Sequence, residues 1–321
     1  MTSGGNTNSL VLRGALVVHT DPPRVLMQDI RVEGGDIVGL GPALPERAGE
    51  SVIDLTGKWI LPGFVCTQER LFAAFARRAS IENLLPLGCE SDLVQLGDAL
   101  DARGIFLSTV IGGLEALRCG VTTVVGPHHW VGRSRDVAGE QVEKALRWIG
   151  LRAVSGLEES WSQFVPHFGT IRQSQAAATF ACGVHPQMSS TVNESPFEIL
   201  SDLQAVYRHG TAAGLKWSVE EGLGVLTGVA RMADSTLEST LGCIRKGAAA
   251  DLVVVQPTPG LNVDASTVAQ VLMDQLRSEN VEGVMVAGQW SWWDGFPTAE
   301  GLDDLHELAQ ISLRSALSVE D

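Results

Sequence analysis

The chain has 321 residues, enough for one large domain or two modest ones, and its formal net charge is −15. That charge argues against nucleic-acid binding, which needs a basic face. No apolar run approaches the roughly 18–20 residues of a membrane span, and residues 1–9 lack the features of a signal peptide. The five cysteines are scattered and form no C-x-x-C pair, which is typical of reduced thiols. We therefore expect a cytoplasmic protein without a nucleic-acid or membrane partner.

The N-terminal part of the chain, residues 10–62, predicts short β-strands separated by Gly and Pro turns. Apolar residues alternate on both sides of Glu33-Gly34-Gly35-Asp36, which predicts a hairpin over 29–41. The same strand pattern continues through 51–61. These features indicate a β-rich domain at this end of the chain.

The middle of the chain, residues 63–240, alternates helix and strand patterns. A helical segment ends at Gly120 and leads into the β-branched strand 121–125. The helical segment 142–150 leads in the same way into a strand at 151–155. This alternation predicts a parallel sheet.

The C-terminal part returns to β-patterns, with a buried strand over 247–255 and a hairpin-like unit over 281–290. Strand-rich ends around a different middle predict a composite β-domain formed by both termini. We expect this composite domain over 10–62 plus 241–297, the inserted domain over 63–240, and a helix over 298–321. The helix is expected either to dock on the surface or to form a subunit interface.

Motifs in order along the chain resemble the amidohydrolase superfamily, in the branch of cytosine deaminase, atrazine chlorohydrolase and 8-oxoguanine deaminase. They are the strand start at 61–65, the segment 71–77, the helix and strand 114–125, His128-His129-Trp130, and the Gly-Ala-Asp-Leu-Val type return at 241–254. The resemblance implies a TIM-type (β/α) barrel inserted in a β-sandwich. It also implies a metal held by a His-x-His on the first barrel strand, two further His, and an Asp on the eighth strand.

This chain departs from the family's metal-ligand motif. Gln68 and Arg70 stand where the two His are expected, and His185 is the best match for the Asp. Arginine is permanently protonated and has no lone pair to donate. We therefore expect a degenerate site with no metal cofactor.

The predicted barrel is also incomplete. The third barrel strand ends near Ser155 and the segment matching strand 8 begins near Thr179, so strands 4–7 have no room. A full barrel takes about 250 residues, and the middle has roughly 180. We expect a degenerate barrel of strands 8-1-2-3, although 179–184 could instead be strand 4.

Open sheet edges and an uncovered apolar face favour association. The main prediction is a non-catalytic structural or regulatory subunit, an inactive pseudoenzyme, in an oligomer with itself or an intact amidohydrolase. The alternative is a hydrolase or deaminase acting on C–N bonds of a small heterocycle. Its rebuilt site would use His128, His129 and His185, with Zn or Fe as cofactor. His128, His129 and Trp130 are also candidates for ligand contact, and a third reading is a metal-free small-molecule binder.

Overall fold

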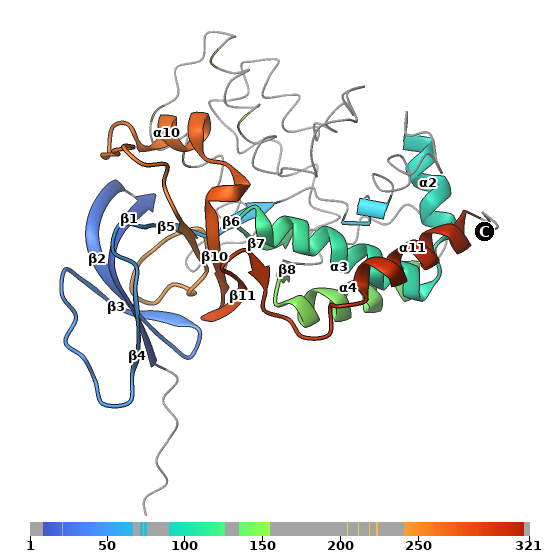
Figure 1. Cartoon of the computed structure of the whole chain (residues 1–321), viewed down its shortest axis with the longest axis horizontal. Coiled ribbons are helices and arrows are strands. Elements are labelled where there is room, and N and C mark those ends of the chain that lie inside the picture. Colours follow the sequence, from blue (N-terminus) through green and yellow to red (C-terminus); the bar gives the residue numbers. More distant parts are fainter. Residues whose placement is uncertain are drawn as a thin grey trace, which may run out of the picture.

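The chain has a mixed α/β fold with one large sheet, which confirms the predicted class (Figure 1). The computed structural model describes residues 9–20, 22–66, 71–72, 74–75, 90–125, 135–154, 204, 211, 218, 223 and 241–317.

The large sheet combines strands from both ends of the chain. Its nine strands run in the order β12-β11-β10-β9-β5-β1-β2-β3, and β4 pairs with β1. The two ends of the chain meet where β5 and β9 pair antiparallel, from Trp59 opposite Val255 to Pro62 opposite Leu252. The strands are β1 (Ser9–Thr20), β2 (Pro23–Glu33), β3 (Asp36–Gly41), β4 (Ser51–Asp54), β5 (Trp59–Pro62), β9 (Leu252–Val255), β10 (Val281–Val286), β11 (Gln289–Trp293) and β12 (Phe296–Pro297).

The predicted β-sandwich differs from what is observed, because the described strands form one hydrogen-bonded sheet. The long β1 carries a register shift at Gly14, whose φ is +74°, and β4 and β5 pair with successive halves of it. The far edge of the sheet folds back, so that the Ile37 amide donates to the Ala248 carbonyl at 2.8 Å. The curled sheet encloses an apolar core that includes Leu12, Ile60 and Val254.

A second sheet has three parallel strands, β6 (Phe64–Cys66), β7 (Val121–Val125) and β8 (Arg152–Val154), in that order. Helix α3 (Ala102–Arg118) leads into β7, and α4 (Arg135–Ile149) leads into β8. Gly120 and Gly150 end the two helices with positive φ, as the sequence predicts. The alternation of helix and strand in this part of the chain is thus confirmed.

The described residues form no closed barrel. The segments predicted as strand 8 or strand 4, near 179–184, lie outside the described residues, so the incomplete barrel and the domain limits stay predictions. A short helix, α2 (Glu90–Ala99), precedes α3.

The remaining helices lie in the C-terminal part of the chain. Helix α11 (Leu305–Ala316) packs on α3 and buries Leu305, Ala309 and Leu313, at the end of the chain where a helix was predicted (Figure 1). Helix α10 (Val268–Gln275) and the 3-10 helix η3 (Ser278–Asn280) lie between β9 and β10 and were not predicted. Within the described ranges, no helix is long and apolar enough to cross a membrane.

Candidate functional site

The candidate site is the edge of the three-stranded sheet at which its strands end. Cys66 of β6 pairs with Val124 of β7, and Val125 of β7 pairs with Val154 of β8. Because the strands are parallel, their carboxyl ends meet at one edge, and enzymes with parallel sheets carry their functional groups there.

The predicted site residues follow these strands in the sequence. Gln68 and Arg70 follow β6, and His128, His129 and Trp130 follow β7; all five lie outside the described residues. His185 lies outside them as well. The structure therefore gives the edge from which the predicted residues continue, and their mutual geometry stays a prediction.

The start of β6 is fixed against β7 by close packing of glycine backbone on side chains. A Cβ added at Gly63 would lie 2.1 Å from Thr122 Oγ1, so only glycine fits there. Thr122 is buried, and its Oγ1 donates to the Phe64 carbonyl at 3.4 Å. Gly120 similarly leaves room for the Phe64 ring, 2.8 Å from the position of an added Cβ. These contacts fix how β6 and β7 are aligned along their length, and both strands lead into predicted site residues.

The start of β8 is tied to the large sheet by an ion pair that sequence reasoning did not identify. Arg152 donates to both carboxylate oxygens of Asp251, from Nε at 3.2 Å and from NH2 at 2.8 Å. The Asp251 side chain is only 2% exposed, and it also accepts from the Ala287 amide at 2.7 Å. The Asp251 carbonyl accepts from Gly63 N at 2.9 Å. In the sequence, the Ala-Asp-Leu motif draws attention to Asp251, but it does not reveal that Arg152 is the residue with which Asp251 pairs.

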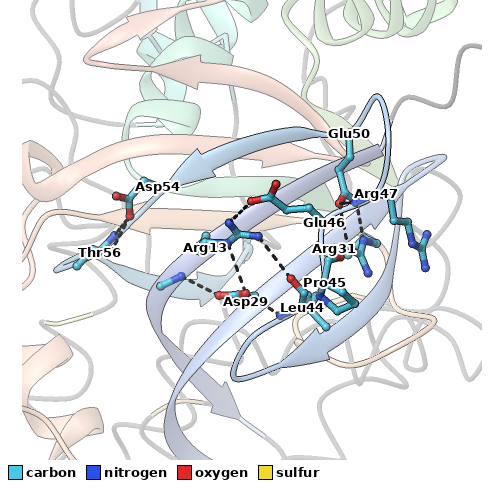
Figure 2. A network of polar contacts seen from close by, with 11 residues as sticks. Arg13, Asp29, Arg31, Leu44, Pro45, Glu46, Arg47, Glu50, Asp54 and Thr56 are labelled. Carbon is cyan, nitrogen blue, oxygen red and sulfur yellow. Dashed lines mark hydrogen bonds and ion pairs between the residues drawn. The ribbon is translucent and has the colours of Figure 1, made fainter.

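The large sheet carries a second polar network, at β1 and β2 (Figure 2). Arg31 donates to both carboxylate oxygens of Glu50, at 2.6 and 3.0 Å, and to the Pro45 carbonyl. The hydroxyl of Ser9 donates to Glu50 at 2.6 Å. The hydrogen bonds from Arg31 lower the pKa of Glu50 to about 2, against the opposing effect of its burial. The network thus joins β1, β2 and the loop that precedes β4.

A second buried carboxylate in the same network, Asp29, is held by backbone donors. The amides of Gly14 and Leu44 donate to its two oxygens, each at 2.9 Å. Arg13 Nε lies 3.7 Å from the same carboxylate. Figure 2 shows Asp29 directed at the loop that carries Leu44, so it anchors this loop to the strand.

The residues at the family's ligand positions do not fit a divalent metal. An amide and a guanidinium, those of Gln68 and Arg70, replace two imidazoles. In the part of the chain that the structure describes, no group of three or more His, Cys, Asp or Glu could hold a metal ion. The buried His19 has both ring nitrogens in hydrogen bonds, to the Ile244 carbonyl at 3.0 Å and to Gln28 at 2.8 Å.

No protein-family model matches the chain. Among curated proteins, 5′-deoxyadenosine deaminase of Methanobrevibacter smithii is 23% identical over 147 residues, which are 46% of this chain and 32% of the relative. Isoxanthopterin deaminase from an unknown prokaryotic organism is 31% identical over 166 residues, 48% of this chain and 34% of the relative. 5-Methylthioadenosine/S-adenosylhomocysteine deaminase of Bacillus cereus is 25% identical over 170 residues, 53% and 34% of the two chains. The chain thus spans about a third of the length of these relatives.

Solved structures share the fold at low sequence identity. Atrazine chlorohydrolase from Arthrobacter aurescens, complexed with zinc, has a TM-score of 0.66 at 16% identity, covering 95% of this chain and 100% of that one. An adenosine deaminase from Xanthomonas campestris with bound zinc has a TM-score of 0.60 at 14% identity, covering 97% and 99%. Guanine deaminase of E. coli has a TM-score of 0.59 at 13% identity, covering 89% and 99%. Together with the deaminase relatives, these structures confirm the resemblance of this chain to the amidohydrolase superfamily.

Proposed function

We propose that this chain is a hydrolase of the deaminase type, acting on a C–N bond of a small heterocycle in the cytoplasm. The observation that carries the proposal is the similarity, over about half of the chain, to deaminases. The names of these relatives specify adenosine derivatives and a pterin. These compounds are fused nitrogen heterocycles with an amino substituent. The structural neighbours, among them a chlorohydrolase and a guanine deaminase, share the fold of this chain.

The proposed site lies at the carboxyl edge of β6, β7 and β8. His128, His129 and His185 are the candidates for acid–base work, because an imidazole can gain and lose a proton near neutral pH. One imidazole would take a proton from water as its oxygen bonds to the ring carbon. That proton, returned to the amine as the C–N bond breaks, would release ammonia. The remaining hydroxyl proton would move to the neighbouring ring nitrogen and leave a ring carbonyl. Trp130 is the candidate for stacking on the heterocycle.

The test is ammonia release by the full chain from a panel of amino-heterocycles, including adenosine derivatives, aminopterins, guanine and aminotriazines. We expect turnover of at least one compound, and a loss of 100-fold or more in kcat in His128→Ala or His185→Ala, because acid–base groups contribute about 10²–10⁴-fold. His306→Ala, on the exposed side of α11, is the matched control and should keep full activity. Absence of ammonia release across the whole panel would count against a deaminase.

A second candidate is a non-catalytic subunit, and the specific observation in its favour is the pair Gln68 and Arg70 at the family's ligand positions. In this reading the chain associates with itself or with an intact amidohydrolase, because an incomplete barrel leaves apolar surface and strand edges to cover. Mass photometry of the purified chain, alone and mixed with such a relative, tests this candidate. A stable monomer that binds no relative would exclude it.

A further inference from the structure

The first half of β2 has an edge with which no described strand pairs. Residues 23–28 pair with β1 on one side, and on the other side β3 pairs with β2 only from Asp29 to Glu33. Leu26 and Met27 in this stretch are 40% and 57% exposed, so solvent reaches the edge. An open edge with exposed apolar side chains favours pairing with a strand of another chain.

The backbone groups that face this open edge follow from the register of β1. The Leu16 amide donates to the Lys58 carbonyl at 2.9 Å, so it points away from β2, where its partner is Met27. In an antiparallel pair without hydrogen bonds between its members, both residues direct their N–H and C=O groups away from the other strand. Because such pairs alternate along the strands, Met27 and Val25 both present an N–H and a C=O at the open edge, whereas Pro23 has no N–H to present.

We infer that this edge pairs with the same edge of a second copy of the chain, antiparallel and about a two-fold axis at Leu26. In this register Val25 lies opposite the partner's Met27, and Met27 lies opposite the partner's Val25. Each of these two pairs can exchange both of its N–H···O=C hydrogen bonds. A two-fold symmetric contact uses the same surface on both copies, and these outward groups are complementary to themselves.

The neighbouring registers are less favourable. A shift by two residues in one direction places Met27 opposite the partner's Pro23, which lacks the N–H. A shift in the other direction places Val25 opposite the partner's Asp29, whose outer side β3 already occupies. In the inferred register Arg24, the one charged residue between 23 and 28, lies opposite the partner's Gln28, so that no like charges face each other.

The inference is independent of the proposed function, because β2 belongs to the large sheet and the candidate site lies on the three-stranded sheet. It also differs from association through an incomplete barrel, which would use other strand edges. The occupant of the β2 edge is a second copy of this chain.

The first test is sedimentation velocity of the full chain at increasing concentration. We expect a reversible monomer–dimer equilibrium with a micromolar dissociation constant, since a contact over residues 24–28 is small. The constant should fall as sodium chloride screens the repulsion between two chains of net charge −15. Leu26→Lys should raise it about tenfold or more, because two ammonium groups would face each other. Val52→Lys is the control, since Val52 is 41% exposed on β4, and should leave the constant unchanged.

The second test measures the register, and it decides the question even if Leu26→Lys fails to fold. Leu26→Cys should give disulfide-linked dimers with oxidised glutathione, because the Cα atoms of opposed residues without hydrogen bonds lie about 4.5 Å apart, within reach of a disulfide. Val25→Cys is the matched control, because position 25 lies diagonally from its own copy and beyond that reach. Its cross-linking should equal that of the native chain, whose five cysteines set the background.

Three results would overturn the inference. They are a chain that stays monomeric at every concentration, a dimer that Leu26→Lys weakens no more than Val52→Lys does, and cross-linking of Leu26→Cys that does not exceed that of Val25→Cys. Ammonia release, or its absence, has no bearing on these outcomes.

Discussion

Single buried residues hold the large sheet together, and the pair Arg31–Glu50 is the clearest case. Their side chains are only 4% and 1% exposed. Replacing Glu50 with Gln would leave the Arg31 guanidinium buried without its counter-charge, at a cost of about 3 kcal/mol in unfolding free energy. Urea denaturation at pH 7 measures this cost. Glu46→Gln is the control, because the Glu46 side chain is 67% exposed and water screens its ion pair with Arg13.

The same carboxylate makes a prediction about pH. The pKa of Glu50 is about 2 in the folded chain, below its ordinary value of 4.5. A lowered pKa contributes stability that is complete above pH 4.5 and is lost as the pH falls towards 2. The difference in unfolding free energy between the native chain and Glu50→Gln should therefore shrink over that interval. A difference that stays constant from pH 6 to pH 2.5 would contradict the assignment.

Arg152 makes the corresponding prediction for the joint between the two sheets. Arg152→Met would leave the buried Asp251 carboxylate without its counter-charge, and we expect a loss of about 3 kcal/mol in unfolding free energy. Arg147→Met is the control, since Arg147 is 78% exposed and pairs with Glu143 one helical turn away. Urea denaturation measures both losses. Equal losses in the two variants would show that the buried pair with Asp251 stabilises the fold no more than the exposed pair does.

At the scale of elements, the close approach of β6 and β7 depends on Gly63. Gly63→Ala would place a methyl group against the buried Thr122, and we expect a loss of about 2 kcal/mol in unfolding free energy. Gly139→Ala in α4 is the opposite case, because nothing lies within 4 Å of its added Cβ and alanine favours a helix by up to about 1 kcal/mol. Thermal unfolding of the two variants should shift in opposite directions, and a shift of the same sign would contradict the packing described here.

Local patterns predicted several elements, because their causes are local. The hairpin turn at Gly34-Gly35 and the helix ends at Gly120 and Gly150 need positive φ, which glycine adopts at low cost. The single curled sheet was not predicted, because β4 and β5 share β1 only through a register shift near Gly14 that alternation does not encode. Helix α10 was also missed, since its eight residues give too short a periodic pattern.

At the scale of the whole molecule, we predict that restoring the two missing histidines does not restore metal binding. The double change Gln68→His, Arg70→His returns the family's motif on one strand alone, whereas zinc sites take three or four protein ligands. We expect no stoichiometric zinc in the purified double variant, as measured by elemental analysis beside the native chain. One zinc per chain in the double variant would show that the remaining ligands are already in place.

The relationship to a superfamily was predictable from sequence because it depends on motifs, such as Ala-Asp-Leu-Val, that recur in order along the chain. The candidate site was predictable only as a set of residue types after β6 and β7. Which side chains meet there depends on contacts between segments far apart in sequence, and no local pattern specifies them. The pairing of Arg152 with Asp251, roughly 100 residues apart, illustrates the same limit.

The pairing of β5 with β9 has a consequence for the order in which the chain folds during synthesis. Pro62 and Leu252 are partners, yet roughly 190 residues separate them. At about 10 residues per second, a ribosome needs roughly 20 s to make that stretch. The edge of β5 that pairs with β9 therefore leaves the ribosome long before β9 does. For this time the nascent chain exposes an unpaired strand edge that other chains can pair with. Slower synthesis should lengthen that exposure and increase aggregation, whereas β2 and β3 can pair as a hairpin as soon as they emerge.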